Sequence, residues 1–172
     1  MNVAIYTHSG NKSGGGMVTG SSDGTVKLWD LRTTECLLTF RPGAGMAAAP
    51  GMSEVAVHTL QAVPNNPDQI FVCTRSSSAY ILTLQGHIVK TFSSGKRTGG
   101  DFLCATISPQ GRLVSAVGED GVMYTFDAKS SELEHVLTVS PADRSILSVA
   151  HHPHRNMLLT VDALGLVKVW DA

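Results

Sequence analysis

SSDGTVKLWD, residues 21–30, is the stretch that decides the fold of this chain. Apolar and polar side chains alternate from Val26 to Trp29, which is the period of two that a β-strand requires. The pair Asp23 and Gly24 before this run is typical of a tight hairpin turn, because glycine readily adopts a positive φ. The stretch therefore predicts a hairpin whose second strand ends in an aromatic residue.

The same pattern returns further along the chain. GEDGVMYTFD (118–127) and ALGLVKVWD (163–171) again place an aromatic residue five positions after a turn glycine, and RSSSAYILT (75–83) is a degraded copy. The last strand position of each copy lies at Trp29, Leu82, Phe126 and Trp170. A period of roughly 40–45 residues is typical of β-propeller blades, so we predict an all-β propeller fold with about four blades.

We expect four blades, at residues 1–40, 54–94, 101–140 and 144–172. RPGAGMAAAPGMS (41–53) is rich in Pro, Gly and Ala and is interpreted as a loop insertion between the first two blades. The sequence begins at an inner strand and stops at the third strand of its last unit. Open sheet edges at both ends favour the C-terminal part of a larger propeller, and a closed four-bladed ring is the alternative.

Charge and cysteine content narrow the class of protein. The formal net charge of -1 gives no global field toward nucleic acid or anionic membranes, so any RNA contact would be local. Cys36, Cys73 and Cys104 are widely spaced in apolar stretches, which predicts buried free thiols in a reducing compartment. No apolar run is long enough to span a membrane, and no basic segment of a secretory signal follows Met1.

Two dipeptides, Trp29-Asp30 and Trp170-Asp171, resemble the signature of WD40 repeats. Three longer segments resemble the C-terminal blades of the Smu family of WD40 splicing factors, in the same order and at nearly the same spacing. They are SSDGTVKLWDLRTTEC (21–36), IVKTFSSGKRTGGDF (88–102) and SVAHHPHRNMLLT (148–160). The sequence departs from the family at SGGG (13–16), where the family has a shorter turn. It also departs at Ala163-Leu164, where the family has an acidic pair before the glycine.

Membership of the Smu family implies a nuclear protein of pre-mRNA splicing whose partners are spliceosomal proteins. The propeller of the family has seven blades and follows an N-terminal LisH-type region that binds the RED splicing factor. That region has no counterpart in this sequence, which makes a RED-type partner doubtful for this chain. The resemblance to WD40 repeats also implies a network of Trp, Asp, Ser or Thr, and His within a blade. Trp29, Asp23 and Ser21 match three of these four positions, and the His is not matched.

Three patterns could indicate chemistry, and each has a simpler interpretation. GSSDG (20–24) matches the G-x-S-x-G nucleophile elbow, but a strand follows Ser22 where the elbow needs a helix. SSGKRTGG (93–100) lacks the first glycine and the final Ser or Thr of a phosphate-binding loop. His151, His152 and His154 cluster without further metal ligands nearby, which favours a turn at a strand end. We therefore predict no catalytic residue, no cofactor, no metal and no small-molecule substrate.

The candidate sites are of two kinds. We predict a partner-binding rim formed by Arg75, Lys96, Arg97 and Asp101, because the loop 93–101 and the turn 75–78 should emerge on the same side. The residues that we expect to maintain the blades are Ser21, Asp23, Gly24, Trp29, Asp120, Gly121, Phe126, Gly165 and Trp170.

The function predicted from these observations is a non-catalytic scaffold of the spliceosome in the nucleus, with no membrane contact. The alternatives are an RNA-binding WD40 module, with Lys96 and Arg97 on RNA phosphates, and a WD40 scaffold of another intracellular complex.

Overall fold

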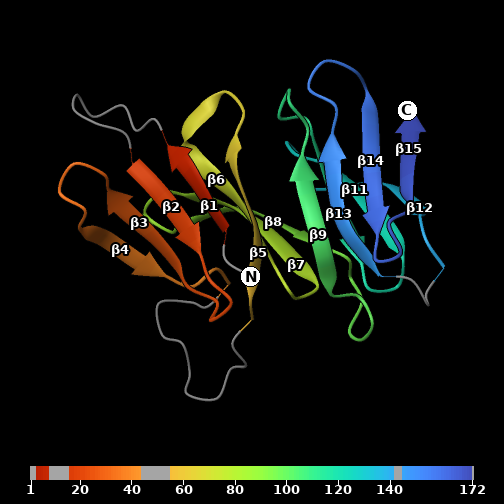
Figure 1. The fold of residues 1–172 in the computed structure, drawn as a ribbon, viewed down its shortest axis with the longest axis horizontal. Helices are drawn as coiled ribbons and strands as arrows, with labels where there is room; N and C mark the ends of the chain where they lie inside the picture. The colour runs from red at the N-terminus through yellow and green to blue at the C-terminus, as the bar shows by residue number, and fades with distance from the viewer. Residues whose placement is uncertain (1–2, 8–15, 44–54, 142–144, 172) are drawn as a thin grey trace. The chain divides into compact units, whose positions relative to one another are not determined.

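The computed structural model describes residues 3–7, 16–43, 55–141 and 145–171, and within these ranges every regular element is a β-strand. The strands form four antiparallel sheets (Figure 1). The all-β fold predicted from the repeat is therefore confirmed. The chain divides into two compact units, Met1–Arg75 with Tyr80–Thr91 and Ser76–Ala79 with Phe92–Ala172.

The first two sheets each contain four strands in sequential order. The strands of the first sheet are β1 (Val3–Thr7), β2 (Gly16–Gly20), β3 (Val26–Asp30) and β4 (Cys36–Phe40). Those of the second sheet are β5 (Val57–Val63), β6 (Asn66–Thr74), β7 (Ser78–Thr83) and β8 (Ile88–Ser93).

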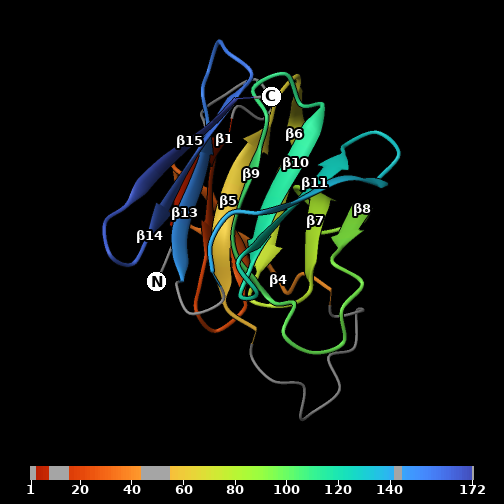
Figure 2. The ribbon, with the colours of Figure 1, turned by 90° about the vertical axis from the view of Figure 1, so that its right-hand side faces the viewer.

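The other two sheets belong to the second unit. One contains β9 (Phe102–Ile107), β10 (Leu113–Gly118), β11 (Val122–Asp127) and β12 (Leu133–Thr138), and its first three strands lie in order in Figure 2. The other contains β13 (Ile146–His151), β14 (Met157–Asp162) and β15 (Val167–Asp171). Among the described residues this last sheet has three strands.

Most of the predicted loop insertion, residues 44–53, lies outside the described residues, as do residues 13–15 of the SGGG segment. The blade limits drawn from the sequence stay a prediction. One expectation about the thiols was wrong. All three cysteines are free and Cys73 and Cys104 are buried, but Cys36 is exposed, because it begins the outer strand β4, where one side of the strand faces solvent.

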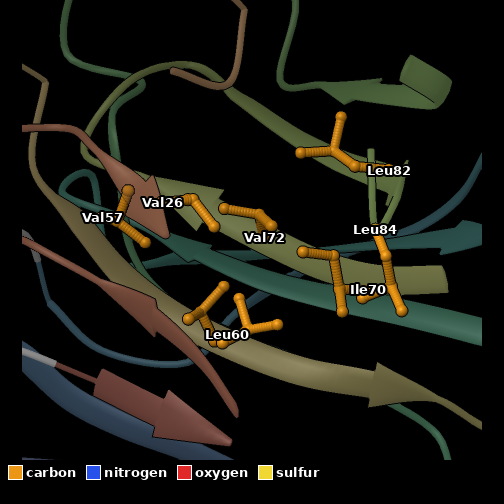
Figure 3. Packing of buried hydrophobic residues seen from close by; sticks show 8 residues of the cluster. Val26, Val57, Leu60, Ile70, Val72, Leu82 and Leu84 are labelled. Atoms are coloured by element: carbon orange, nitrogen blue, oxygen red, sulfur yellow. The ribbon is translucent and has the colours of Figure 1, made fainter. Parts of the chain in front are cut away.

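Apolar packing between neighbouring sheets forms the core of the first unit. Strand β1 lies against β5, and the cluster combines side chains of both sheets (Figure 3). Its buried members are Val18, Val26, Val57, Leu60, Ile70, Val72, Leu82 and Leu84. Burying one such side chain contributes about 1.5–3 kcal/mol, so the sheets stabilise each other through these contacts.

The core of the second unit has the same origin. Strand β9 lies against β13, and Cys104, Val117 and Met123 of one sheet pack with Ile146 and Val149 of the other. Leu158 and Trp170 cover this cluster from the last sheet. A four-stranded sheet therefore buries its apolar face against the next sheet in both units.

The tryptophans that end the repeated strand each donate an indole hydrogen bond to a threonine ten residues earlier. Nε1 of Trp29 lies 2.9 Å from Oγ1 of Thr19, and Nε1 of Trp170 lies 2.9 Å from Oγ1 of Thr160. The third sheet has Phe126 at this position and Ala116 at the position of the threonine. Donor and acceptor are thus replaced together, which leaves no unpaired indole or hydroxyl group at these two positions.

Two glycines of the repeated hairpin differ in their surroundings. Both have positive φ, +71° at Gly121 and +81° at Gly165. A Cβ atom on Gly121 would lie 2.3 Å from the carbonyl oxygen of Ser140, whereas a Cβ on Gly165 would meet nothing within 4 Å. Only the first position combines a backbone constraint with a steric one.

We predict that Gly165→Ala lowers the free energy of unfolding by about 1 kcal/mol, the cost of a left-handed conformation. Gly121→Ala should cost roughly 2–4 kcal/mol, because the methyl group also displaces the Ser140 carbonyl. Urea denaturation of both variants, followed by tryptophan fluorescence, measures the difference. Equal losses at the two positions would contradict this account of the turn.

Candidate interaction surface

The loop that carries the predicted rim is fastened at both ends. The N–H of Ser94 donates to the carbonyl oxygen of Ser77 at 3.0 Å, and the N–H of Phe102 donates to that of Ser76 at 2.8 Å. Inside the loop, the hydroxyl of Ser94 donates to the carbonyl oxygen of Gly100 at 3.1 Å. The loop therefore lies beside the serine turn that precedes β7, in a defined conformation.

Lys96 is bound to its neighbours within this surface. Its ammonium group donates to Oδ2 of Asp120 and lies 5.9 Å from the ring centroid of Tyr124. The hydroxyl of Tyr124 donates to the same carboxylate oxygen at 2.7 Å, and the N–H of Val122 donates to its other oxygen at 3.1 Å. Asp120, expected from the sequence to maintain the hairpin turn, thus also connects the loop 93–101, called the rim loop below, to the sheet of β9–β12.

The charges of this cluster depend on one another. Burial acts to raise the pKa of Asp120, but hydrogen bonds from Lys96, Tyr124 and Val122 outweigh it and hold that pKa below its usual value. The hydrogen bond with Asp120 raises the pKa of Lys96. Burial and the same carboxylate raise the pKa of Tyr124. At neutral pH the cluster contains an ammonium, a carboxylate and a neutral phenol.

The other rim candidates make fewer contacts. Arg97 is exposed at the tip of the loop, and Asp101 is half-buried and accepts the N–H of Glu119 at 2.9 Å through its carbonyl oxygen. Arg75 is exposed, belongs to the first unit, and donates its N–H to the carbonyl oxygen of Ala56 at 2.8 Å. A single rim that includes all four residues stays a prediction.

The histidine cluster forms a turn after β13. Nδ1 of His152 accepts the N–H groups of His154 and Arg155, each at 3.0 Å. Nε2 of His151 is buried and has no hydrogen-bond partner, and burial lowers the pKa of this side chain. Among the residues that the structure describes, no three His, Cys, Asp or Glu side chains are arranged to hold a metal ion.

The segments that resembled catalytic motifs have ordinary surroundings. Strand β3 begins at Val26, shortly after Ser22, and strand β9 follows the loop 93–101. The helix that a nucleophile elbow or a phosphate loop needs is replaced by a strand in both cases. No helix within the described ranges is long and apolar enough to cross a membrane.

Sequence reasoning missed three groups that maintain the blades. Thr19 and Thr160 accept the indole hydrogen bonds, whereas the hydroxyl oxygen of Ser21 accepts the N–H of Asp23, at 3.3 Å. Asp162 takes the place of the absent acidic pair: its Oδ1 accepts the N–H groups of Leu164 and Leu166, each at 2.9 Å. The ten-residue spacing from threonine to tryptophan, present in the first and last repeats, is a signal that could have identified the acceptors.

We predict that Asp120→Asn lowers the free energy of unfolding above about pH 5 by no more than about 1 kcal/mol, because Lys96 is largely exposed. The folded protein lowers the pKa of Asp120, so its stabilisation is present above the pKa of the unfolded chain and is lost as pH falls through the folded value. Urea denaturation across this pH range measures the effect. Glu119→Gln, on the same turn, is the control; an equal pH dependence in both variants would contradict the assignment.

Comparison with known proteins gives the family. The WD40 model, described as WD domain, G-beta repeat, matches residues 3–30 and 132–171. WD40 repeat-containing protein smu1 of Dictyostelium discoideum is 30% identical over 172 residues, which are 100% of this chain and 30% of that protein. Eukaryotic translation initiation factor 3 subunit I of Debaryomyces hansenii is 25% identical over 90% of this chain and 49% of its own length.

A solved structure supports the fold alone. The β-propeller domain of Cps50 (Swd1) from Myceliophteria thermophila superposes with a TM-score of 0.75 at 16% identity, covering 100% of this chain and 51% of that domain. The chain thus spans between 30% and 51% of the length of these three proteins. Its repeats, its sheets and its similarity to smu1 over its full length agree: the chain is a WD40-repeat protein of the Smu family.

Proposed function

We propose that this chain is a non-catalytic protein-interaction scaffold that acts in pre-mRNA splicing in the nucleus. The observation that carries the proposal is the similarity to smu1 along the entire chain, since the Smu resemblance implies splicing. WD40 domains generally mediate contacts between proteins, and the antiparallel sheets present their turns as a surface for such contacts. The partners proposed for this surface are spliceosomal proteins.

The rim loop supports contact with protein more than with RNA. Lys96 forms an ion pair with Asp120, so its charge is already neutralised and attracts phosphates weakly. Arg97 is the exposed cation that remains in the loop 93–101. Binding to RNA gains from several lysine or arginine contacts at once. An RNA-binding module is therefore the second candidate, and it depends on Arg97.

Affinity capture from nuclear extract, followed by mass spectrometry, tests the proposal. The chain should enrich splicing proteins, and Arg97→Glu should reduce that enrichment severalfold by reversing an exposed charge in the rim loop. Arg32→Glu is the matched control, because Arg32 is also exposed but lies in the turn after β3.

Three results would count against this function or against the rim loop as its contact surface. Enrichment of another complex without splicing proteins would favour a scaffold of a different process. Equal enrichment by Arg97→Glu and wild type would remove the rim loop from the contact. Capture that disappears after ribonuclease treatment, together with binding to homopolymeric RNA that weakens steeply with salt, would favour the RNA-binding alternative.

A further inference from the structure

The second unit contains a polar cavity away from the rim loop. Its volume is about 560 Å³, which lies within the range of small-ligand sites. One wall is the turn between β9 and β10, from Ser108 to Leu113, and the other is the turn between β13 and β14, from His151 to Asn156. Asp127 and Glu134 complete the lining from β11 and β12.

Hydrogen bonds fix both walls. The hydroxyl oxygen of Ser108 accepts the N–H groups of Arg112 and Leu113 at 3.1 Å and 3.0 Å. Nδ1 of His152 accepts two N–H groups of its own turn, as described above. This bonding uses the lone pair of Nδ1, so the neutral ring carries its proton on Nε2 and that N–H is a donor. The cavity is therefore lined by turns that need little rearrangement to receive a ligand.

One lining group lacks a partner. Nε2 of His151 is buried without a hydrogen bond, and burial lowers the pKa of the ring, which keeps it neutral near pH 7. A buried polar atom left unpaired destabilises a folded protein. Nε2 has almost no accessible surface, so a ligand would reach this atom only after a movement of the His151 ring.

The lining of the cavity contains two guanidinium groups and two carboxylates. Arg112 and Arg155 contribute two guanidinium groups, and the histidines add imidazole nitrogens. One oxygen of Asp127 is used within its own turn, because its Oδ1 accepts the N–H groups of Lys129 and Ser130 at 2.8 Å and 2.6 Å. Those backbone bonds, and the charge of Arg112, lower its pKa. Glu134 is the other carboxylate in the lining.

We propose that this cavity binds the carboxylate side chain of an aspartate or glutamate in a peptide segment of a partner protein. The guanidinium of Arg155 supplies the main charge, because arginine presents paired N–H donors that match a carboxylate. The Nε2–H of His152 supplies a neutral hydrogen bond. The identity of the partner as a protein rests on the proposed scaffold function, whereas the recognition of a carboxylate rests on the lining alone.

Titration with three small probes, followed by NMR of the histidine rings, tests the inference. The probes are N-acetyl-glutamate amide, N-acetyl-glutamine amide and N-acetyl-lysine amide. N-acetyl-glutamate amide should shift the ring resonances of His151 and His152 with a Kd on the order of 1–10 mM, as expected for so small a ligand. N-acetyl-glutamine amide should bind at least about tenfold more weakly, because it lacks the charge.

Variants locate the site. Arg155→Glu should weaken the glutamate probe at least about tenfold, and Arg32→Glu, an exposed arginine outside the cavity, should leave its Kd unchanged. Glu134→Gln should strengthen binding, because it removes the opposing carboxylate. If Arg155→Glu has a lower urea midpoint than the wild type, it is destabilised and its weaker binding is ambiguous. Glu134→Gln then decides the test.

Three outcomes would overturn the inference: no saturable shift with the glutamate probe, stronger binding of N-acetyl-lysine amide, or unchanged or weaker binding in Glu134→Gln. These outcomes are independent of the capture experiment above. A chain that binds the probe but captures no splicing protein would retain the carboxylate site and lose the proposed role in splicing. A chain that captures splicing proteins but does not bind the probe would retain the proposed role in splicing and lose the carboxylate site.

Discussion

Packing between neighbouring sheets is the interaction on which the rest of this structure depends. Strands of five to nine residues cannot bury apolar side chains within one sheet. In the first unit β1 lies against β5, and in the second unit β9 lies against β13, so the apolar side chains between these facing sheets are buried. The turns can then present polar and charged groups without contributing to the core.

The sequence was sufficient to predict the strands and the repeat, because both follow from local periodicity. The alternation around Trp29 lies within ten residues, and the turn glycine recurs at the same distance before the aromatic residue in GEDGVMYTFD (118–127) and ALGLVKVWD (163–171). Similarity to smu1 agrees with the family resemblance. Exposure of Cys36 was not predictable in this way. An apolar neighbourhood along the chain does not reveal that a strand is the outer one of its sheet, with one side toward solvent.

The candidate site was harder to predict than the fold, because its contacts join residues that are far apart in the sequence. Lys96 and Arg97 look equivalent in the sequence, yet Lys96 is bound to Asp120, 24 residues away, and Arg97 is exposed. The polar cavity depends on turns from two different sheets, which no local pattern brings together. A turn at a strand end was predicted for the histidine cluster in preference to a metal site, and Nδ1 of His152 closes such a turn.

Hydrogen exchange of Val149→Ala compared with wild type tests the packing between sheets most directly. Val149 is only 6% exposed and belongs to β13, but its cluster includes side chains of the neighbouring sheet. The packing described here predicts faster amide exchange in β9 as well as in β13, because the cavity left by the removed methyl groups weakens both sheets. Faster exchange confined to the sheet of β13, β14 and β15 would contradict it.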